Sequence, residues 1–222
     1  MIAESELNEA LERGLQQLAG FGVPEIPASQ RLQLVSLVAL LSKWNKVYNL
    51  TAVRDPLTMV DRHLLDSLIM SRWLPASSAA DDSQYDVMDI GTGAGLPVLP
   101  LALVRPDLRF LSIESNGKKI RFQQQALMEL GVRNVTVLHD RVENVTDSAH
   151  MVLSRAFTAP VDFLKVAEPL CAPDGLVAVM LGHAERLPVS LGSAYTLSEL
   201  VQVDVPGTDS ARHVALCRRQ HG

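Results

Sequence analysis

The chain has 222 residues, of which 47% are hydrophobic, and it carries a formal net charge of -5 at pH 7. This length and apolar content are enough for one domain with a sizeable core and a small extension, and they exclude disordered and collagen-like chains. The negative charge excludes indiscriminate nucleic-acid binding, which depends on basic surfaces that neutralise phosphates, so we expect any such contact in a local patch.

The N-terminal part of the chain has the residue spacing of helices. Glu4 to Leu18 carries leucines three and four positions apart, the pattern of an amphipathic helix. Ser29 is expected to cap a second helix, and Asp55-Pro56 to begin a third. In the second helix Trp44 and Tyr48 fall on the apolar face, so we expect them to be core residues rather than a platform for a ligand.

A segment rich in alanine and serine, from Pro75 to Ser83, follows these helices. We expect it to link an N-terminal helical extension over residues 1–75 to a second domain over residues 76–222. The amino terminus is acidic, the reverse of a basic signal peptide, and no apolar run reaches the ~20 residues of a membrane helix. The sequence therefore predicts a cytoplasmic protein with no membrane partner, and nothing in it requires more than a monomer.

A glycine-rich segment opens the second domain. A short apolar run ends at Asp89-Ile90, glycines follow at alternate positions from Gly91 to Gly95, and Pro97 then opens an apolar stretch with helical spacing. This order predicts a strand, a tight turn and a helix. Glycines are needed where backbone must lie against a ligand, so Gly91 and Gly93 are expected to contact a cofactor. For this motif alone, a plain glycine-rich turn is the competing interpretation.

A second acidic residue indicates the kind of cofactor. About twenty residues after the glycines, the predicted strand Phe110–Glu114 ends in a carboxylate, at the spacing where such a group meets the ribose of a nucleotide-like ligand. Leu96 stands where the dinucleotide fingerprint requires glycine. Asp89 would repel a phosphate, whereas it could hold an ammonium group through intervening contacts. These residues favour S-adenosylmethionine over a nicotinamide dinucleotide, and hence a methyltransferase over a dehydrogenase.

Strands and helices alternate from residue 87 onward, which predicts a parallel sheet covered on both faces. The tail differs, because two alternating segments flank Pro206–Ser210, the pattern of an antiparallel hairpin. The sequence therefore predicts an α/β, Rossmann-like class I methyltransferase fold, with a mostly parallel seven-stranded sheet and a C-terminal antiparallel hairpin. The elements expected after the second strand are helix Lys118–Leu130, strand Val135–Leu138, a loop or short helix at His139–Val145, strand Met151–Ser154, helix Pro160–Cys171, strand Gly175–Leu181 and the hairpin strands Leu200–Val205 and His213–Cys217.

The cysteines and histidines carry no signal for a disulfide or a metal. Cys171 and Cys217 lie far apart without metal-ligand spacing, and the 6 histidines are not clustered. We therefore expect reduced cysteines in the core or in strands, and no metal site.

Arg155 directly follows a predicted buried strand, at the sheet edge where ligands bind. Its planar guanidinium group suits a carboxylate or the O6 and N7 edge of guanine. Pairing with a neighbouring acid is the competing interpretation. The same loop lacks the Asn/Asp-Pro-Pro-aromatic sequence of amino-group methylation, and no cysteine stands where carbon-5 methylation needs one. Guanine N7 requires neither base nor nucleophile, because its in-plane lone pair is free to attack a methyl group. The sequence therefore fits N7 methylation.

Two small basic clusters interrupt this acidic sequence. Lys118, Lys119 and Arg121 lie close together, and Arg212 precedes a pair of arginines near the carboxyl end. Such clusters suit local contact with RNA phosphates, and solvated surface charge is the competing interpretation.

Several segments, in chain order, together resemble the RsmG (GidB) family of bacterial 16S ribosomal RNA guanine-N7 methyltransferases. The resemblance covers nearly the whole chain from about residue 30 and is far more specific than the glycine loop alone. Its segments are Lys43–Thr51 (KWNKVYNLT), Arg54–Pro56, Arg62–Ser67 (RHLLDS), Asp89–Pro97 (DIGTGAGLP), Gly117–Phe122 (GKKIRF), Arg141–Glu143, Ser154–Ala156 and Arg212-His213.

The resemblance implies methyl transfer from S-adenosylmethionine to N7 of the guanine customarily numbered 527 in 16S rRNA, with that RNA or the small ribosomal subunit as partner. We expect Arg155 to be the catalytic residue, through orienting the base and holding phosphates. The cofactor-binding residues that the resemblance implies are Gly91, Leu96, Glu114, Val142, Glu143 and Arg155, to which the residue pattern adds Asp89 and Gly93. The RNA-binding residues are Lys118, Arg121, Arg155, Arg212 and, with less support, Arg141.

The chain departs from the family pattern at Leu181, where the family carries a lysine, so a basic group expected near the RNA is absent. This departure keeps open a non-catalytic RNA-binding assembly factor with the same fold. A methyltransferase that acts on a small molecule or a protein is a further alternative, and the basic cluster from Lys118 to Arg121 counts against it.

Overall fold

A single sheet of seven strands organises the chain, in the order β3-β2-β1-β4-β5-β7-β6. The computed structural model describes residues 3–77, 85–155, 159–182, 194–208 and 211–220. Strands β1 to β5 pair in parallel, and β7 pairs antiparallel with both β5 and β6, so the predicted fold class is confirmed. The strands are β1 (Tyr85–Ile90), β2 (Phe110–Glu114), β3 (Val135–His139), β4 (Ala149–Arg155), β5 (Cys171–Leu181), β6 (Tyr195–Val203) and β7 (Arg212–Arg219).

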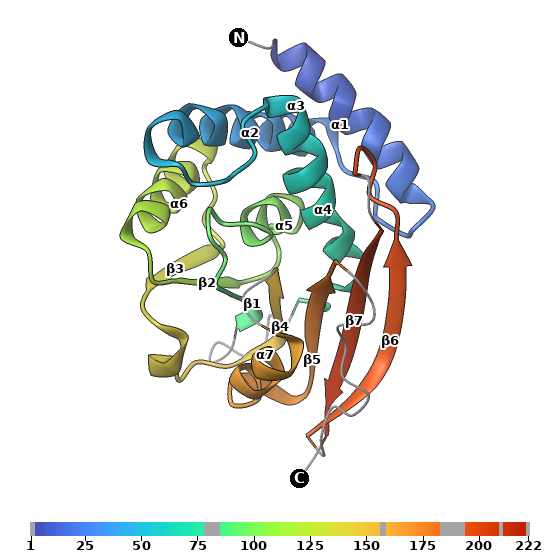
Figure 1. The fold of residues 1–222 in the computed structure, drawn as a ribbon, viewed down its shortest axis with the longest axis vertical. Helices are drawn as coiled ribbons and strands as arrows, with labels where there is room; N and C mark the ends of the chain where they lie inside the picture. Colours follow the sequence, from blue (N-terminus) through green and yellow to red (C-terminus); the bar gives the residue numbers. More distant parts are fainter. Residues whose placement is uncertain (1–2, 78–84, 156–158, 183–193, 209–210, 221–222) are drawn as a thin grey trace.

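Helices cover both faces of the sheet, and the N-terminal helices form a further layer beside α5 and α6 (Figure 1). Within the described part of the chain, every helix is too short or too polar to span a membrane. The helices are α1 (Glu4–Ala19), α2 (Ala28–Tyr48), α3 (Pro56–Met59), the π-helical η1 (Val60–Leu65), α4 (Asp66–Leu68), the 3-10 helix η2 (Ile69–Trp73), α5 (Val98–Val104), α6 (Gly117–Leu130), the 3-10 helix η3 (Val142–Asn144) and α7 (Pro160–Ala167).

Alternating side chains of the strands build two hydrophobic clusters, one on each side of the sheet. In β1, Val87 belongs to the cluster with the N-terminal helices, α5 and α6, whereas Met88 belongs to the cluster with α7. This division follows from the two-residue period of a strand. Leu11 of α1 and Leu65 of η1 are both 0% exposed and belong to the same cluster as Val87. The N-terminal helices therefore share a core with the sheet, and the division of the chain at residue 75 stays a prediction.

Several predicted boundaries differ from the structure. Ser29 does not cap α2, because the helix already begins at Ala28, with Pro27 as its N-cap. Asp55 does cap α3, since its Oδ2 accepts the Thr58 N–H at 2.8 Å. Most of the expected linker lies outside the described residues.

The helix expected to reach Cys171 ends at Ala167 instead. Cys171 begins β5, because its backbone is in register with Ala149 of the neighbouring parallel strand. Both Cys171 and Cys217 are free, buried strand residues, as expected. Burial raises the pKa of each thiol to about 11.

A substitution in α1 tests whether the helical layer and the sheet unfold together. Leu11→Ala opens a cavity in the shared core, so we expect it to lower the free energy of unfolding by about 2–4 kcal/mol. Because the core is continuous, urea unfolding followed by circular dichroism should still show one transition, shifted as a whole. The matched control is Leu32→Ala, whose side chain is 59% exposed, with a change below about 0.5 kcal/mol. Two transitions, of which only one moves, would contradict this expectation.

Candidate functional site

An open pocket of about 440 Å³ lies at the carboxyl ends of β1 and β2. In an open α/β sheet this edge is where ligands bind. Four predicted cofactor residues, Gly91, Glu114, Val142 and Glu143, line the pocket together with Arg141, which was predicted to bind RNA. The remaining lining residues are Ile90, Ile113, Ser115, Lys119 and Asp140.

The glycine loop is held in one shape by its neighbours. Gly91, Gly93 and Gly95 all have positive φ, which side chains of L-residues rarely tolerate. The Gly93 N–H donates to Glu114 Oε2 at 2.9 Å, and its carbonyl accepts from Gln123 Nε2 at 2.9 Å. A Cβ at Gly95 would lie 2.5 Å from Leu99, so this glycine is required for packing rather than for a ligand. Of the three glycines, only Gly91 lines the pocket.

Glu114 is 8% exposed, and its carboxylate is oriented by backbone groups. Its Oε1 accepts the Asn116 N–H at 2.8 Å, and its Oε2 accepts the Gly93 N–H. The ammonium group of Lys119 lies 3.8 Å from Oε2. Each carboxylate oxygen has two acceptor sites, so the group retains capacity for the hydroxyl groups of a ligand in the pocket.

The other four predicted cofactor residues, Asp89, Gly93, Leu96 and Arg155, do not line the pocket. Asp89 is 0% exposed, and its Oδ2 accepts the Val98 N–H at 3.3 Å at the start of α5. Its Oδ1 is buried without a hydrogen-bond partner among the described residues. Burial raises the pKa of Asp89 to about 7, although the positive charge of Arg155 acts in the opposite direction. Leu96 is 5% exposed and belongs to the core cluster.

Asp66 joins two of the predicted functional arginines, and the sequence did not single it out. Its side chain is 5% exposed; Oδ2 lies 3.1 Å from Arg155 Nη1, and Oδ1 lies 3.1 Å from Arg212 Nε. Arg155 Nη1 also donates to the carbonyl of Arg62 at 3.0 Å. Arg155 ends β4 and Arg212 begins β7, whereas Asp66 directly follows the π-helical turn η1. The competing interpretation of Arg155, pairing with an acid, is thus observed, with one carboxylate facing two guanidinium groups.

His63 completes this cluster without adding charge to it. The side chain is 6% exposed, and burial lowers the pKa of its imidazole to about 4, with further repulsion from Arg155. Nδ1 lies 3.0 Å from the Arg62 carbonyl, which can only accept, so Nδ1 carries the proton. Nε2 then accepts the Thr51 hydroxyl at 2.9 Å. The neutral imidazole therefore fixes the backbone that holds Arg155.

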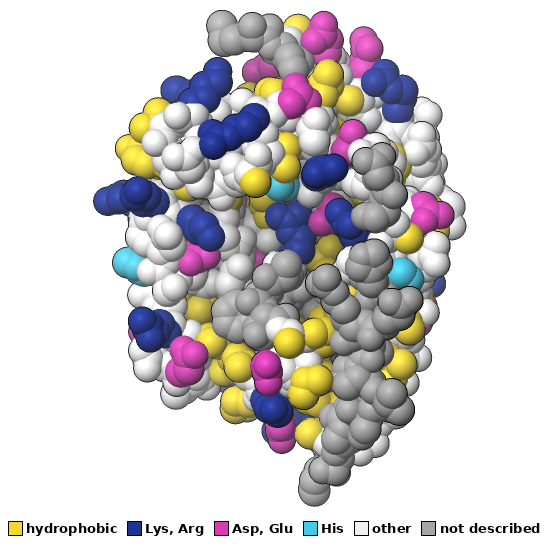
Figure 2. Space-filling model, in the orientation of Figure 1, with side chains coloured by type: hydrophobic (Ala, Val, Ile, Leu, Met, Phe, Trp, Pro, Cys, Tyr) yellow, Lys and Arg dark blue, Asp and Glu magenta, His cyan; other side chains and the backbone are white. Residues whose placement is uncertain are grey.

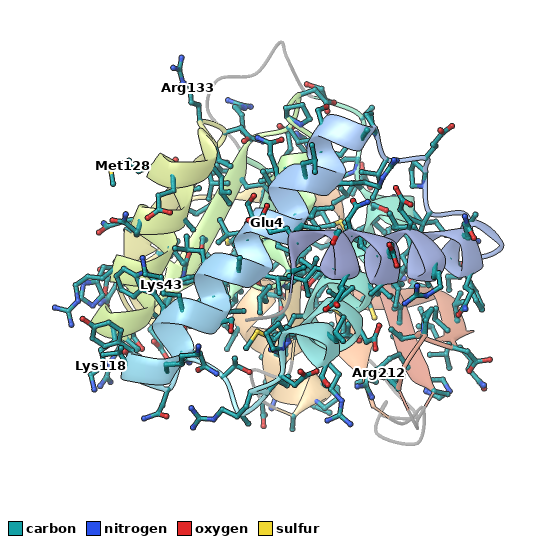
Figure 3. The ribbon with its side chains drawn as sticks, turned by 90° about the horizontal axis from the view of Figure 1, so that it is seen from above. Glu4, Lys43, Lys118, Met128, Arg133 and Arg212 are labelled. Atoms are coloured by element: carbon teal, nitrogen blue, oxygen red, sulfur yellow. The ribbon has the colours of Figure 1, made fainter. Side chains whose placement is uncertain are left out.

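Two of the predicted RNA-binding residues, Lys118 and Arg212, can be located in Figure 3. Figure 3 shows Lys118 and Arg212 projecting on the same side, with Arg133 on another. Lys118 and Arg121 are exposed on α6. In Figure 2, Lys and Arg side chains are spread over the upper half of the face shown, whereas hydrophobic side chains gather in its lower half, around α7. Of the cations, Lys119 and Arg141 line the pocket, and a local RNA-binding patch stays a prediction.

Leu181, which stands where the family carries a lysine, is a core residue. It is 5% exposed at the end of β5 and packs in the cluster that contains Phe163 of α7. The described residues contain no group of His, Cys, Asp and Glu side chains that could hold a metal ion.

The buried carboxyl group of Asp89 predicts a pH effect on stability. Because its native pKa of about 7 exceeds the ~3.9 of an unfolded chain, the native protein keeps a proton that the unfolded chain releases. This contribution to stability is complete below about pH 4 and is lost as the pH rises through about 7. Asp89→Asn removes the titration. In urea experiments, the free energy of unfolding of the variant minus that of wild type should therefore increase as the pH is raised from about 4 to about 8. Parallel pH profiles would refute this assignment.

Comparison with known proteins places the chain in a family. The model of the family described as rRNA small subunit methyltransferase G matches residues 30–215. Proteins named ribosomal RNA small subunit methyltransferase G include one from Shewanella amazonensis, 40% identical over 96% of this chain and 97% of its own length. Another, from Chromohalobacter salexigens, is 42% identical over 95% of this chain and 96% of its own length.

Among solved structures, a protein of Thermoplasma acidophilum assigned as a methyltransferase has a TM-score of 0.51 at 12% identity, covering 63% of this chain and 70% of that chain. This likeness supports the fold. The match over residues 30–215 and the identity along almost the entire length show that the chain belongs to the rRNA small subunit methyltransferase G family.

Proposed function

We propose that this chain transfers the methyl group of S-adenosylmethionine to N7 of a guanine in 16S ribosomal RNA, within the small subunit or its RNA. The observation that carries the proposal is the pocket at the carboxyl ends of β1 and β2, beside the arginine pair that Asp66 holds, in a chain of this family. The pocket would take the cofactor, and the arginine pair would face the RNA.

The residues of the pocket fit such a cofactor. Gly91 lines it without a side chain, and the oriented carboxylate of Glu114 has acceptor capacity for ribose hydroxyl groups. Val142 and Glu143 offer an apolar and a polar contact for the adenine. When bound, S-adenosylmethionine supplies an electrophilic methyl group.

His63 and the two cysteines are not placed to transfer a proton to or from a substrate. His63 is neutral and uses both ring nitrogens within the fold, and the raised pKa values keep both cysteines as thiols near neutral pH. Guanine N7 attacks through a lone pair that is already free, so alignment of the base is the main requirement. The neutral His63 and the two thiols are therefore compatible with N7 as the acceptor.

Arg155 is the residue that we assign to orienting the guanine. Its hydrogen bonds to described residues, Asp66 and the Arg62 carbonyl, both use Nη1. The proposal therefore assigns its Nε and Nη2 groups to the base edge or to a phosphate. Arg212 shares the same carboxylate. The two guanidinium groups that Asp66 joins are the groups that the proposal turns toward the RNA.

A non-catalytic assembly factor is the second candidate, and Leu181 is the observation that favours it. An apolar side chain buried against the α7 layer gives the RNA no cation at this strand end. The two candidates differ in their need for the cofactor, because an assembly factor has no reason to bind S-adenosylmethionine tightly.

The first test is methyl transfer from labelled S-adenosylmethionine to small ribosomal subunits and to deproteinised 16S RNA, both from a strain that lacks the enzyme. Borohydride and aniline cleavage then maps N7-methylguanine. We expect cleavage at a single guanine. The acceptor that takes up more labelled methyl group identifies the substrate as the free RNA or the small subunit. Cofactor binding without methylation of either RNA would point to another acceptor. Absence of cofactor binding would favour the assembly factor.

The second test concerns Arg155 alone. Arg155→Ala removes a group that we place on the guanine, so kcat/KM should fall at least ~10-fold, about 1.4 kcal/mol of transition-state stabilisation. Arg133→Ala is the matched control, because Arg133 is exposed on another side of the molecule. Thermal unfolding of both variants separates this loss from a loss of fold. A value for Arg155→Ala within about threefold of wild type would show that the assignment is wrong.

A further inference from the structure

An aromatic side chain stands on the surface at the end of α2. Tyr48 is 39% exposed, so the expectation that it belongs to the core is wrong, whereas Trp44 is half-buried against the core. The Tyr48 and Trp44 ring centroids are 5.1 Å apart, and those of Trp44 and Phe122 are 5.8 Å apart. Phe122 is 0% exposed. The rings therefore form a column from the core to the surface, and the outermost ring is supported from beneath.

The backbone around Tyr48 is equally well fixed. Asn49 ends α2 in the left-handed conformation, with φ 52°. The buried Asn45 amide donates to the Val53 carbonyl at 2.9 Å and accepts the Thr51 N–H at 2.9 Å. These contacts fold the following loop back onto the helix end. A side chain on such a support loses little freedom on binding a ligand.

The packing of α2 on α6 sets the position of Tyr48 relative to the candidate cofactor pocket. Helices α2 and α6 run antiparallel, since Gln33 bonds to the Leu130 carbonyl at one end and Trp44 packs on Phe122 further along. One more helical turn brings Tyr48 level with the first turn of α6. That turn contains Lys119, which lines the pocket.

Exposed cations lie on the two helix ends that flank this ring and on the loop after α2. Lys43 and Lys46 are exposed on the last turns of α2, Lys118 and Arg121 on α6, and Arg54 donates to Asn49 Oδ1 at 2.7 Å. Figure 3 shows Lys43 and Lys118 on the same side of the molecule. Neither Lys43–Asn49 nor Gly117–Phe122 contains an acidic residue. An aromatic ring among cations matches an unpaired nucleotide, whose base stacks and whose phosphates meet the positive charges.

We propose that Tyr48 is a stacking platform for an unpaired nucleotide of the RNA substrate, close to the methylated guanine. The inference rests on the proposed function in taking RNA as the substrate, but it does not require turnover. The platform would hold RNA beside the pocket by base stacking, which adds to the phosphate contacts of Lys118 and Arg121. It would therefore affect RNA affinity and leave cofactor affinity unchanged.

The test measures the affinity of wild type and variants for a 16S RNA fragment that contains the target guanine and for small ribosomal subunits. Tyr48→Ala should weaken binding to the better of these partners at least about fivefold, and Tyr48→Phe should stay within about twofold, because stacking needs the ring and not the hydroxyl. Val47→Ala, adjacent in sequence and 69% exposed, is the control and should bind like wild type. The salt dependence of RNA affinity should stay unchanged in Tyr48→Ala and become shallower in Lys118→Gln, since only the lysine contacts a phosphate and releases counterions.

A second measurement identifies the stacked base. Single abasic nucleotides are placed in turn along the RNA fragment, and one of them should weaken binding to wild type but not to Tyr48→Ala. Three results would overturn the platform. Wild type and Tyr48→Ala could bind RNA with equal affinity, the Phe and Ala variants could lose the same affinity, or wild type could bind neither RNA partner. If Tyr48 stacks on the RNA and the protein binds the cofactor but transfers no methyl group, the proposed function is refuted and the platform is still supported.

Discussion

The carboxylate of Asp66 is the interaction on which the arrangement of the site depends. It bonds Arg155 at the end of β4 and Arg212 at the start of β7, two strands that β5 separates in the sheet. Two guanidinium groups placed this close repel each other unless a negative charge lies between them. Because Asp66 belongs to the N-terminal helical layer, that layer is part of the site and not only a cover for the sheet.

The neighbouring groups hold this carboxylate and its partners in place. The neutral imidazole of His63 binds the Arg62 carbonyl, which in turn accepts from Arg155. On the other side of the site, Glu114 is fixed by the N–H groups of Gly93 and Asn116. Most of these contacts involve main-chain groups, so the geometry follows from the fold itself. A pocket built in this way needs little rearrangement when a ligand enters.

The sequence predicted the fold well because its strands are short apolar runs bounded by turn residues, as at Phe110–Glu114, where prediction and structure coincide. It missed Asp66, because the partners of this residue lie 89 and 146 positions away and no local pattern connects them. Tyr48 was misjudged because periodicity tells which side of a helix is apolar but not where the partner helix stops. The pocket-lining residues that were predicted stay predictions as ligands, since the lining alone does not show what binds.

The antiparallel direction of β7 has a consequence for how the protein matures. A parallel strand would present its last residue at this edge, whereas β7 presents its first, Arg212, next to the end of β5. The bond from Arg212 to Asp66 closes a loop of 146 positions, so it forms only when both ends of the fold have met. A nascent or partly folded chain therefore lacks the assembled cation pair. The two arginines of the candidate site are therefore brought together only in the completed fold, however early the individual strands form.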